Sequence, residues 1–294
     1  MLLPQLDPRL EQRLMQLYKE HCERAANIDW SYHEFIPWEQ GQSFKTNPWS
    51  PEQRKLPPAI YTAIETALLT EVNLPWFTVY LSSTFVGSLD VMQEFIHTWV
   101  AEEDQHSNLL ETYLLITRNA NPHELHHLRK TVVEQGFVQT FTTPFEAMCY
   151  ASLQELATLV FYNNVAKAAA PYDRELSLLL RRLAKDESLH YAFYRDAVKA
   201  HLELEPNYVY HAAHVLKNFY MPGSNMPDYQ ERMKAIAREA NYGPAQFYQQ
   251  VTRVLVEYWG IADLRPTSAE AELARLELLK HNARLERVAA RFAI

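Results

Sequence analysis

The sequence predicts an all-α protein, a four-helix bundle with one long crossover connection and additional packed helices. The chain has 294 residues, only six glycines and 48% hydrophobic residues, which suits one large helical core. Alternating runs of Val, Ile and Thr are largely absent, whereas long segments carry Leu, Ala, Glu, Arg and Gln at helical spacing. One pattern of glutamates and histidines also occurs twice, and its spacing fits two antiparallel helix hairpins.

The repeated pattern is a lone glutamate followed 32 residues later by Glu-x-x-His. The residues are Glu71, Glu103 and His106 in the first copy and Glu155, Glu187 and His190 in the second. Positions i and i+3 share a helix face, so each Glu-x-x-His can direct a carboxylate and an imidazole to one point. The midpoints fall on helix breakers, near Gly87 and Ser88 in the first copy and at Pro171 in the second. Each arm is then about 24 Å long, which places these side chains deep inside the bundle.

These residue types indicate the metal. Four carboxylates and two histidines form an oxygen-rich set that suits iron or manganese. A glutamate from each of two helices plus Glu-x-x-His from each of two others is the ligand scheme of ferritin-like di-iron and di-manganese proteins. The six residues therefore predict a carboxylate-bridged site for two iron ions in a ferritin-like bundle.

Three neighbouring residues refine this prediction. Glu102 and Asp186 each precede a ligand glutamate, and each could accept the N–H of the histidine from the opposite hairpin. Pro75 cannot donate to the carbonyl of Glu71, so the helix should bend or unwind at this ligand.

The elements are expected to form a single domain, 1–294, in three parts. Residues 1–58 comprise an amphipathic helix and an irregular segment, 59–204 the bundle, and 205–294 additional C-terminal helices. The crossover holds a short helix that Gly136 can stop. Helices are expected over residues 8–27, 59–86, 89–118, 122–135, 145–169, 172–204, 207–219, 227–240, 244–260 and 267–292.

One motif, His-Glu-Leu-His-His at 123–127, satisfies the H-E-x-x-H pattern of zinc proteases and the H-x-x-H-H box of membrane desaturases. The first requires a helix interior over a substrate cleft, and the second requires further histidine boxes and membrane spans. The motif instead follows Asn121-Pro122 directly. It is therefore predicted to be the polar start of a short helix.

The composition argues against membrane-spanning, disulfide-rich and nucleic-acid-binding proteins. No stretch approaches 18 consecutive apolar residues, and the first residues lack the features of a signal peptide, so a cytoplasmic protein without a membrane span is expected. Cys22 and Cys149 form no disulfide framework or metal pattern. The net charge of −8 argues against general nucleic-acid binding.

Five segments together resemble one family. Thr-Glu-Val-Asn-Leu-Pro at 70–75 is similar to its Thr-Glu-Glu-x-Leu-Pro, and 99–106 and 186–190 resemble its Trp-x-Ala-Glu-Glu-x-x-His and Asp-Glu-x-x-His motifs. Residues 154–158 match its third-helix motif, and 30–37 its Trp-x-x-x-x-Phe-x-Pro element. The chain thus resembles the soluble acyl-acyl carrier protein desaturases, closest to their shorter bacterial branch. It departs at Ser107, often glycine in the family, and at Ser188-Leu189, where a basic residue is frequent.

The resemblance implies a homodimer that uses a reduced di-iron centre, O2 and two electrons, typically from ferredoxin. The reaction would place a cis double bond in an acyl chain held on acyl carrier protein. Glu71 and His106 would complete the ligation of one iron and Glu155 and His190 that of the other, with Glu103 and Glu187 as bridges.

The resemblance also assigns three outer residues. Trp30 and Asp186 would form an electron path with His106, and Thr158 would lie by the oxygen-binding face. A threonine within a helix can equally bond its own backbone.

The acyl chain and its carrier need their own surfaces. An acidic carrier requires a local basic patch on a protein of charge −8, and the candidates are Arg181, Arg182 and Lys185, or Arg129 and Lys130. Plausible walls of an acyl tunnel are Trp76, Phe77, Leu110, Tyr113, Leu159 and Tyr162.

Three other functions stay open at this point. A hydroxylase would use the same ligands to insert oxygen into an acyl chain, an iron-storage or regulatory ferritin-like protein would have no organic substrate, and a silent paralogue would only bind the carrier. The N-terminal segment and the residues after the bundle weigh against storage, because a bare bundle would suffice. All six ligands are present, so ligand loss gives the silent paralogue no support.

Overall fold

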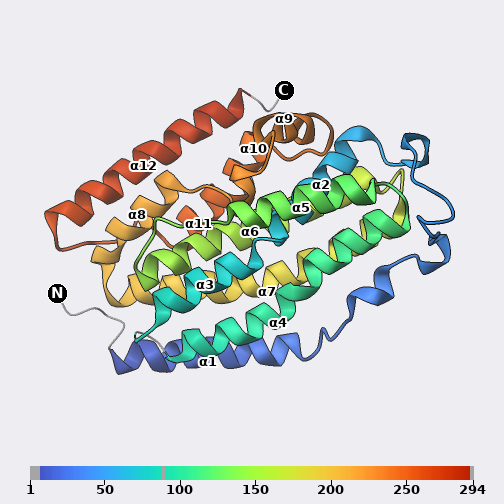
Figure 1. Cartoon of the computed structure of the whole chain (residues 1–294). Coiled ribbons are helices and arrows are strands. Elements are labelled where there is room, and N and C mark those ends of the chain that lie inside the picture. The colour runs from blue at the N-terminus through green and yellow to red at the C-terminus, as the bar shows by residue number, and fades with distance from the viewer. Residues whose placement is uncertain (1–6, 88–89, 292–294) are drawn as a thin grey trace.

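The computed structural model describes residues 7–87 and 90–291, and within these ranges the chain forms helices and loops without a strand (Figure 1). This confirms the predicted all-α class. The helices are α1 (Pro8–Ala25), α2 (Pro58–Glu71), α3 (Leu74–Phe85), α4 (Asp90–Ile116), α5 (Pro122–Gln135), α6 (Pro144–Ala169), α7 (Arg174–Leu204), α8 (Val209–Asn218), α9 (Tyr229–Glu239), α10 (Pro244–Phe247), α11 (Arg253–Tyr258) and α12 (Ala269–Ala290).

The bundle consists of two hairpins, α2 and α3 with α4, and α6 with α7. Within the second hairpin, α6 packs along the length of α7, and α2 packs on both α4 and α6. The predicted turn at Pro171 is present, and the Asp173 side chain caps α7 by accepting from the Leu176 N–H at 2.9 Å. In the first hairpin the turn includes Gly87, whose φ of 70° favours glycine, while Ser88 lies outside the described residues.

The helix expected over 59–86 is in fact two helices that meet at the predicted ligand. α2 ends at Glu71 and α3 begins at Leu74, so the bend expected from Pro75 is confirmed and is sharp enough to interrupt the helix. The Asn73 side chain donates to the Leu69 carbonyl at 3.1 Å, which satisfies one of the carbonyls left at the end of α2.

The crossover between the hairpins carries α5, as expected. The Asn121 side chain accepts from the His123 backbone N–H at 3.0 Å, and Gly136, with φ 68°, ends the helix. The His-Glu-Leu-His-His motif therefore begins a capped crossover helix, and its histidines are absent from the candidate metal groups among the described residues.

The remaining helices surround the bundle. α1 lies along α4 and α7 on one side, and α8 and α12 pack together on the other (Figure 1). Between α1 and α2 the chain forms three short 3-10 helices, Tyr32–Phe35, Trp38–Gln40 and Pro51–Gln53. The helix expected over 244–260 is divided, because a π-helical segment, Tyr248–Thr252, separates α10 from α11. None of the helices in the described part of the chain has the length and apolar character needed to cross a membrane.

Candidate metal centre

The fold brings the six predicted ligands together at the centre of the bundle. They form two overlapping groups, Glu103 with Glu155, Glu187 and His190, and Glu103 with Glu71 and His106. In each group the potential ligand atoms lie within 4.8 Å of one another. All six except the partly accessible Glu71 are buried. Two groups that share Glu103 suit two neighbouring metal ions bridged by a carboxylate.

The distances show which atoms face this space. His106 Nδ1 lies 2.9 Å from Glu103 Oε2 and 3.3 Å from Glu187 Oε1, and His190 Nδ1 lies 2.8 Å from Glu103 Oε1. Among the described residues, neither Nδ1 atom has a partner with hydrogen-bond geometry. Glu103 Oε1 and Glu187 Oε1 also lack such a partner. Buried lone pairs that converge without hydrogen bonds fit a metal site better than a network of side chains alone.

The charges of the cluster support the same interpretation. Burial and then the charge of Glu103 raise the pKa of Glu187 well above its usual range and that of Glu71 to about 7. Burial also opposes charge on Glu103, but His106 and His190 outweigh it and lower the pKa of Glu103. Four carboxylates, three of them buried, therefore lie close together with only two histidines among them, and bound divalent ions would offset the negative charge.

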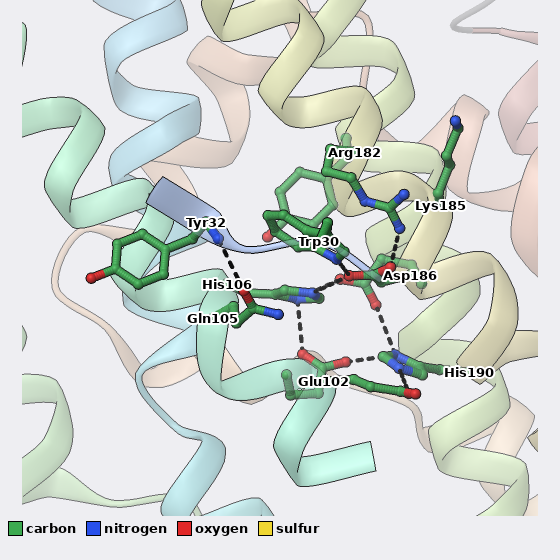
Figure 2. Close-up of polar contacts among 12 residues, drawn as sticks. Trp30, Tyr32, Glu102, Gln105, His106, Arg182, Lys185, Asp186 and His190 are labelled. Carbon is green, nitrogen blue, oxygen red and sulfur yellow. Dashed lines mark hydrogen bonds and ion pairs between the residues drawn. The ribbon is translucent and has the colours of Figure 1, made fainter. Parts of the chain in front are cut away.

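The outer nitrogen of each histidine meets an acid from the opposite hairpin, as the sequence predicts (Figure 2). His106 Nε2 lies 3.4 Å from Asp186 Oδ2, and His190 Nε2 lies 2.9 Å from Glu102 Oε2. Such a carboxylate fixes the ring with its N–H outward, which leaves Nδ1 free to bind a metal.

Asp186 is itself held by two further side chains, one of them unexpected. The Trp30 indole N–H donates to Asp186 Oδ2 at 2.8 Å, so Trp30, Asp186 and His106 are contiguous. Arg182 forms an ion pair with the other oxygen of Asp186 and lies over the Trp30 ring. Only 8% of Arg182 is exposed, so its proposed role in carrier docking is wrong. Its neighbour Lys185 points away from this network (Figure 2).

The sequence did not predict two hydrogen bonds to the cluster, from Tyr162 and Trp99, or one from His21 to the neighbouring acid Glu102. The hydroxyl of Tyr162 donates to Glu71 Oε1, and the Trp99 indole donates to Glu155 Oε1 at 3.1 Å. His21 of α1 places Nε2 at 3.1 Å from Glu102 Oε2. Burial raises the pKa of Tyr162 well above its usual range, so this residue stays protonated and can donate.

A cavity of about 480 Å³ reaches the cluster on the side of Glu71. Its bundle wall comes from α2 and α6, including Ala67, Thr158 and Tyr162, and its opposite wall comes from residues 219–247. Mostly apolar side chains line it, as in sites for apolar ligands.

Of the six residues predicted to wall an acyl tunnel, Tyr162 alone lines this cavity. Phe77 lines a second cavity of about 20 Å³, and Leu110 and Tyr113 are fully buried core residues. Trp76 is 41% exposed and donates to the Val133 carbonyl, and Leu159 packs against the core. Residues distant in sequence supply about half of the wall of this cavity.

Thr158 makes the bond to its own helix that the sequence allows, and its place by an oxygen-binding face stays a prediction. Its hydroxyl donates to the Gln154 carbonyl of its own helix at 3.0 Å. Its side chain also lines the large and the small cavity, and Glu71 does the same. Thr158 therefore lies where the metal cluster meets the cavities.

This bundle has a ferritin-like helical fold, and its buried glutamate and histidine set has the ligand arrangement of carboxylate metal proteins. A model of the fatty acid desaturase family matches residues 3–294. The candidate acyl-acyl carrier protein desaturase DesA1 of Mycobacterium tuberculosis is 30% identical, over 94% of this chain and 83% of its own length. The chain therefore belongs to the fatty acid desaturase family, as its motifs predict.

Two more distant relatives agree. The chloroplast stearoyl-acyl carrier protein 9-desaturase 5 of Oryza sativa subsp. japonica is 24% identical, over 92% of this chain and 72% of its own. The X-ray structure of the candidate acyl-ACP desaturase DesA2 from M. tuberculosis H37Rv superposes with a TM-score of 0.68 at 23% identity. This alignment covers 90% of this chain and 99% of the DesA2 chain, which supports the fold.

Proposed function

We propose that this protein is an acyl-acyl carrier protein desaturase, which inserts a cis double bond into a fatty acyl chain held on acyl carrier protein. The observation that carries the proposal is the meeting of the glutamate and histidine cluster with the 480 Å³ cavity at Glu71 and Thr158. A storage protein would not need an apolar cavity of this size beside its metal site.

The proposed ligands would hold two iron ions. Glu71 and His106 would complete one ion and Glu155 and His190 the other, with Glu103 and Glu187 between them. The reduced ions would supply the activation of O2 that an unactivated C–H bond requires. Overall, the acyl chain loses two hydrogen atoms. O2 accepts these two hydrogen atoms together with two electrons and two protons, and is reduced to two water molecules.

The task of the protein is then positioning. The apolar walls of the cavity would hold the acyl chain extended past Thr158 and exclude water from it. Glu102 and Asp186 would keep the two imidazoles oriented toward the ions. Trp30, in contact with Asp186, would begin a path for electrons to His106.

The names of the relatives support acyl carrier protein as the partner. For its docking we propose the exposed Arg181 and Lys185 of α7, or Arg129 and Lys130 of α5, of which Arg129 also pairs with Glu111. A ferredoxin-type electron donor, a homodimer and a cytoplasmic location complete the proposal, and they rest on the family resemblance.

The test is the intact mass of a panel of acyl carrier proteins after incubation with iron-loaded protein, O2 and a ferredoxin reducing system. Loss of two hydrogens from one acyl chain is the expected result. A gain of one oxygen would instead identify a hydroxylase, and no change across the panel would contradict both enzyme functions.

Two substitutions at the cluster sharpen this test. Glu155→Ala and His190→Ala should each abolish oxygen-dependent turnover while circular dichroism still reports a helical fold. Glu203→Ala, at an exposed position of α7, is the matched control and should retain turnover. Full activity of either cluster variant would refute the ligand assignment.

A further inference from the structure

The buried face of α1 contains one residue that does not fit its pattern. Leu10, Leu14 and Leu17 follow helical spacing, and the next position in this series is His21. The side chain of His21 is as buried as the leucines, with the residue 4% exposed. A fourth leucine would complete the apolar face, so packing alone does not explain the histidine.

The polar contacts of His21 all lead to one acid. Nε2 lies 3.1 Å from Glu102 Oε2 and 3.4 Å from Oε1, whereas Nδ1 is buried without a hydrogen-bond partner among the described residues. Phe95 packs against the ring edge-on at 5.0 Å between centroids. The ring of His21 is therefore fixed in place with its single hydrogen-bonding nitrogen directed at Glu102.

Glu102 connects α1 to the metal cluster. The carboxylate accepts from His190 Nε2 at 2.9 Å, and the rings of His21 and His190 stack with centroids 6.0 Å apart. Burial opposes its charge, but the hydrogen bonds from His190 and His21 lower the pKa of Glu102 to about 2. About a quarter of the Glu102 side chain is exposed, 23%, so water competes for this carboxylate. A second donor keeps it in place.

We infer that His21 is a positioning residue for the metal centre, because it holds Glu102 against His190 and so directs Nδ1 of His190 at the cluster. The inference rests on the metal centre of the proposed function. It assigns a role in the site to α1, a helix outside the bundle that contributes no ligand. The corresponding acid in the other hairpin, Asp186, is held by Trp30 and Arg182. The N-terminal segment therefore supplies one hydrogen-bond donor to each of the two acids, His21 to Glu102 and Trp30 to Asp186.

His21→Leu separates positioning from folding, since leucine restores the apolar face of α1. The probe is Co²⁺ alone, which replaces iron and gives an absorption spectrum sensitive to ligand geometry. We expect Co²⁺ affinity to fall by up to about 10-fold with an altered spectrum, because His21 acts on the ligand through Glu102, whereas loss of a direct partner of a ligand typically costs about 10- to 100-fold. The melting temperature of the metal-free protein should not fall. His21→Gln keeps an N–H donor and should recover much of the affinity.

Tyr18→Phe is the matched control. Tyr18 lies one helical turn earlier on the same helix and bonds Thr98 of α4 at 2.8 Å, so this change removes a hydrogen bond of the same interface without touching Glu102. Its Co²⁺ affinity should equal that of the wild type.

Three results would overturn the inference. Wild-type affinity and spectrum in His21→Leu would show that Glu102 needs no second donor. Equal loss in His21→Gln and His21→Leu, with a lower melting temperature in both, would indicate a structural role only. A wild-type protein that binds no Co²⁺ would overturn the proposed function as well, which distinguishes that failure from the first two.

Discussion

The two hairpins carry the same pattern of ligands but differ at the lone glutamate. Glu71 ends α2, and α3 begins three residues later, whereas Glu155 lies inside the unbroken α6. Glu155 is fully buried, while Glu71 is partly accessible and lines both cavities. The comparison teaches that one helix break, at residues 72–73 just before Pro75, can give a symmetric ligand set one open side.

The two glutamates also differ in the groups that contact them. Burial and the charge of Glu103 raise the pKa of Glu71 to about 7, and the Tyr162 hydroxyl that bonds it partly counteracts them. Glu155 has the indole N–H of Trp99 as its donor and lines neither of these two cavities. We therefore expect acyl chain and O2 to approach on the Glu71 side, and the second hairpin to act as the rigid half of the site.

The largest effect should come from blocking the open side. Ala67→Phe places a ring in the cavity one turn before Glu71, where it would displace the acyl chain. We expect turnover of long acyl chains to fall about 100-fold or more, because small misplacements of a substrate already have effects of this size. Steady-state rates with acyl carrier proteins of several chain lengths provide the measurement, alongside metal content, which should remain that of the wild type.

Ala67→Ser adds a single oxygen at the same position and serves as the control, with turnover close to wild type. Undiminished turnover of every chain length in Ala67→Phe would show that the acyl chain does not use this cavity.

The elements nearest the ligands were the most predictable. Helical spacing and breakers such as Pro171 predicted the hairpins, and the missing N–H of Pro75 predicted the interruption at Glu71, because these are local properties of the chain. The cross-hairpin bonds of Glu102 and Asp186 followed from the repeat itself, since each precedes a ligand in the same helical register.

The outer contacts and the cavity were less predictable. Residues 219–247 form half of the cavity wall, and no periodicity within a helix reveals where it will dock. Arg182 resembled a surface cation in sequence, but it is buried and forms an ion pair with Asp186. His21 could have been noticed, because it occupies a leucine position in the series Leu10, Leu14 and Leu17.

A smaller effect, on metal affinity, should come from removing the hydrogen-bond donors of Glu155 and Glu71, and it should be unequal for the two. Trp99→Phe removes the indole N–H from the fully buried Glu155, where water cannot replace it, so metal affinity should fall about 10- to 100-fold. Tyr162→Phe removes the hydroxyl from Glu71, where water from the cavities can replace it, and the loss should be clearly smaller. Equilibrium titration of the metal-free variants with Co²⁺ measures both.

Phe77→Leu controls for packing in this pair, because Phe77 contacts Trp99 edge-on at 5.5 Å and has no hydrogen bond to lose. Its affinity should stay near wild type. If Tyr162→Phe lost as much affinity as Trp99→Phe, the two glutamates would be equivalent and the contrast between the hairpins would fail.

The smallest effect concerns the packing of the second hairpin and vanishes at neutral pH. His201 of α7 is fully buried, and among the described residues its one hydrogen-bond partner is the carbonyl of Ala197 in its own helix. Burial lowers the pKa of His201 from 6.5 to about 4. The folded-state pKa is below the unfolded one, so the unfolded chain binds an extra proton between these pH values. The contribution of His201 to the free energy of unfolding is therefore complete above about pH 6.5. It is lost as pH falls, by about 1.4 kcal/mol at pH 5.5.

His201→Leu should remove this part of the acid sensitivity, as measured by urea unfolding of metal-free protein at pH 7.5 and 5.5. His126→Leu on the surface of α5 should not remove it. An unchanged pH dependence in His201→Leu would mean that the far end of α7 opens to water, and that the second hairpin is less rigid than its unbroken helices suggest.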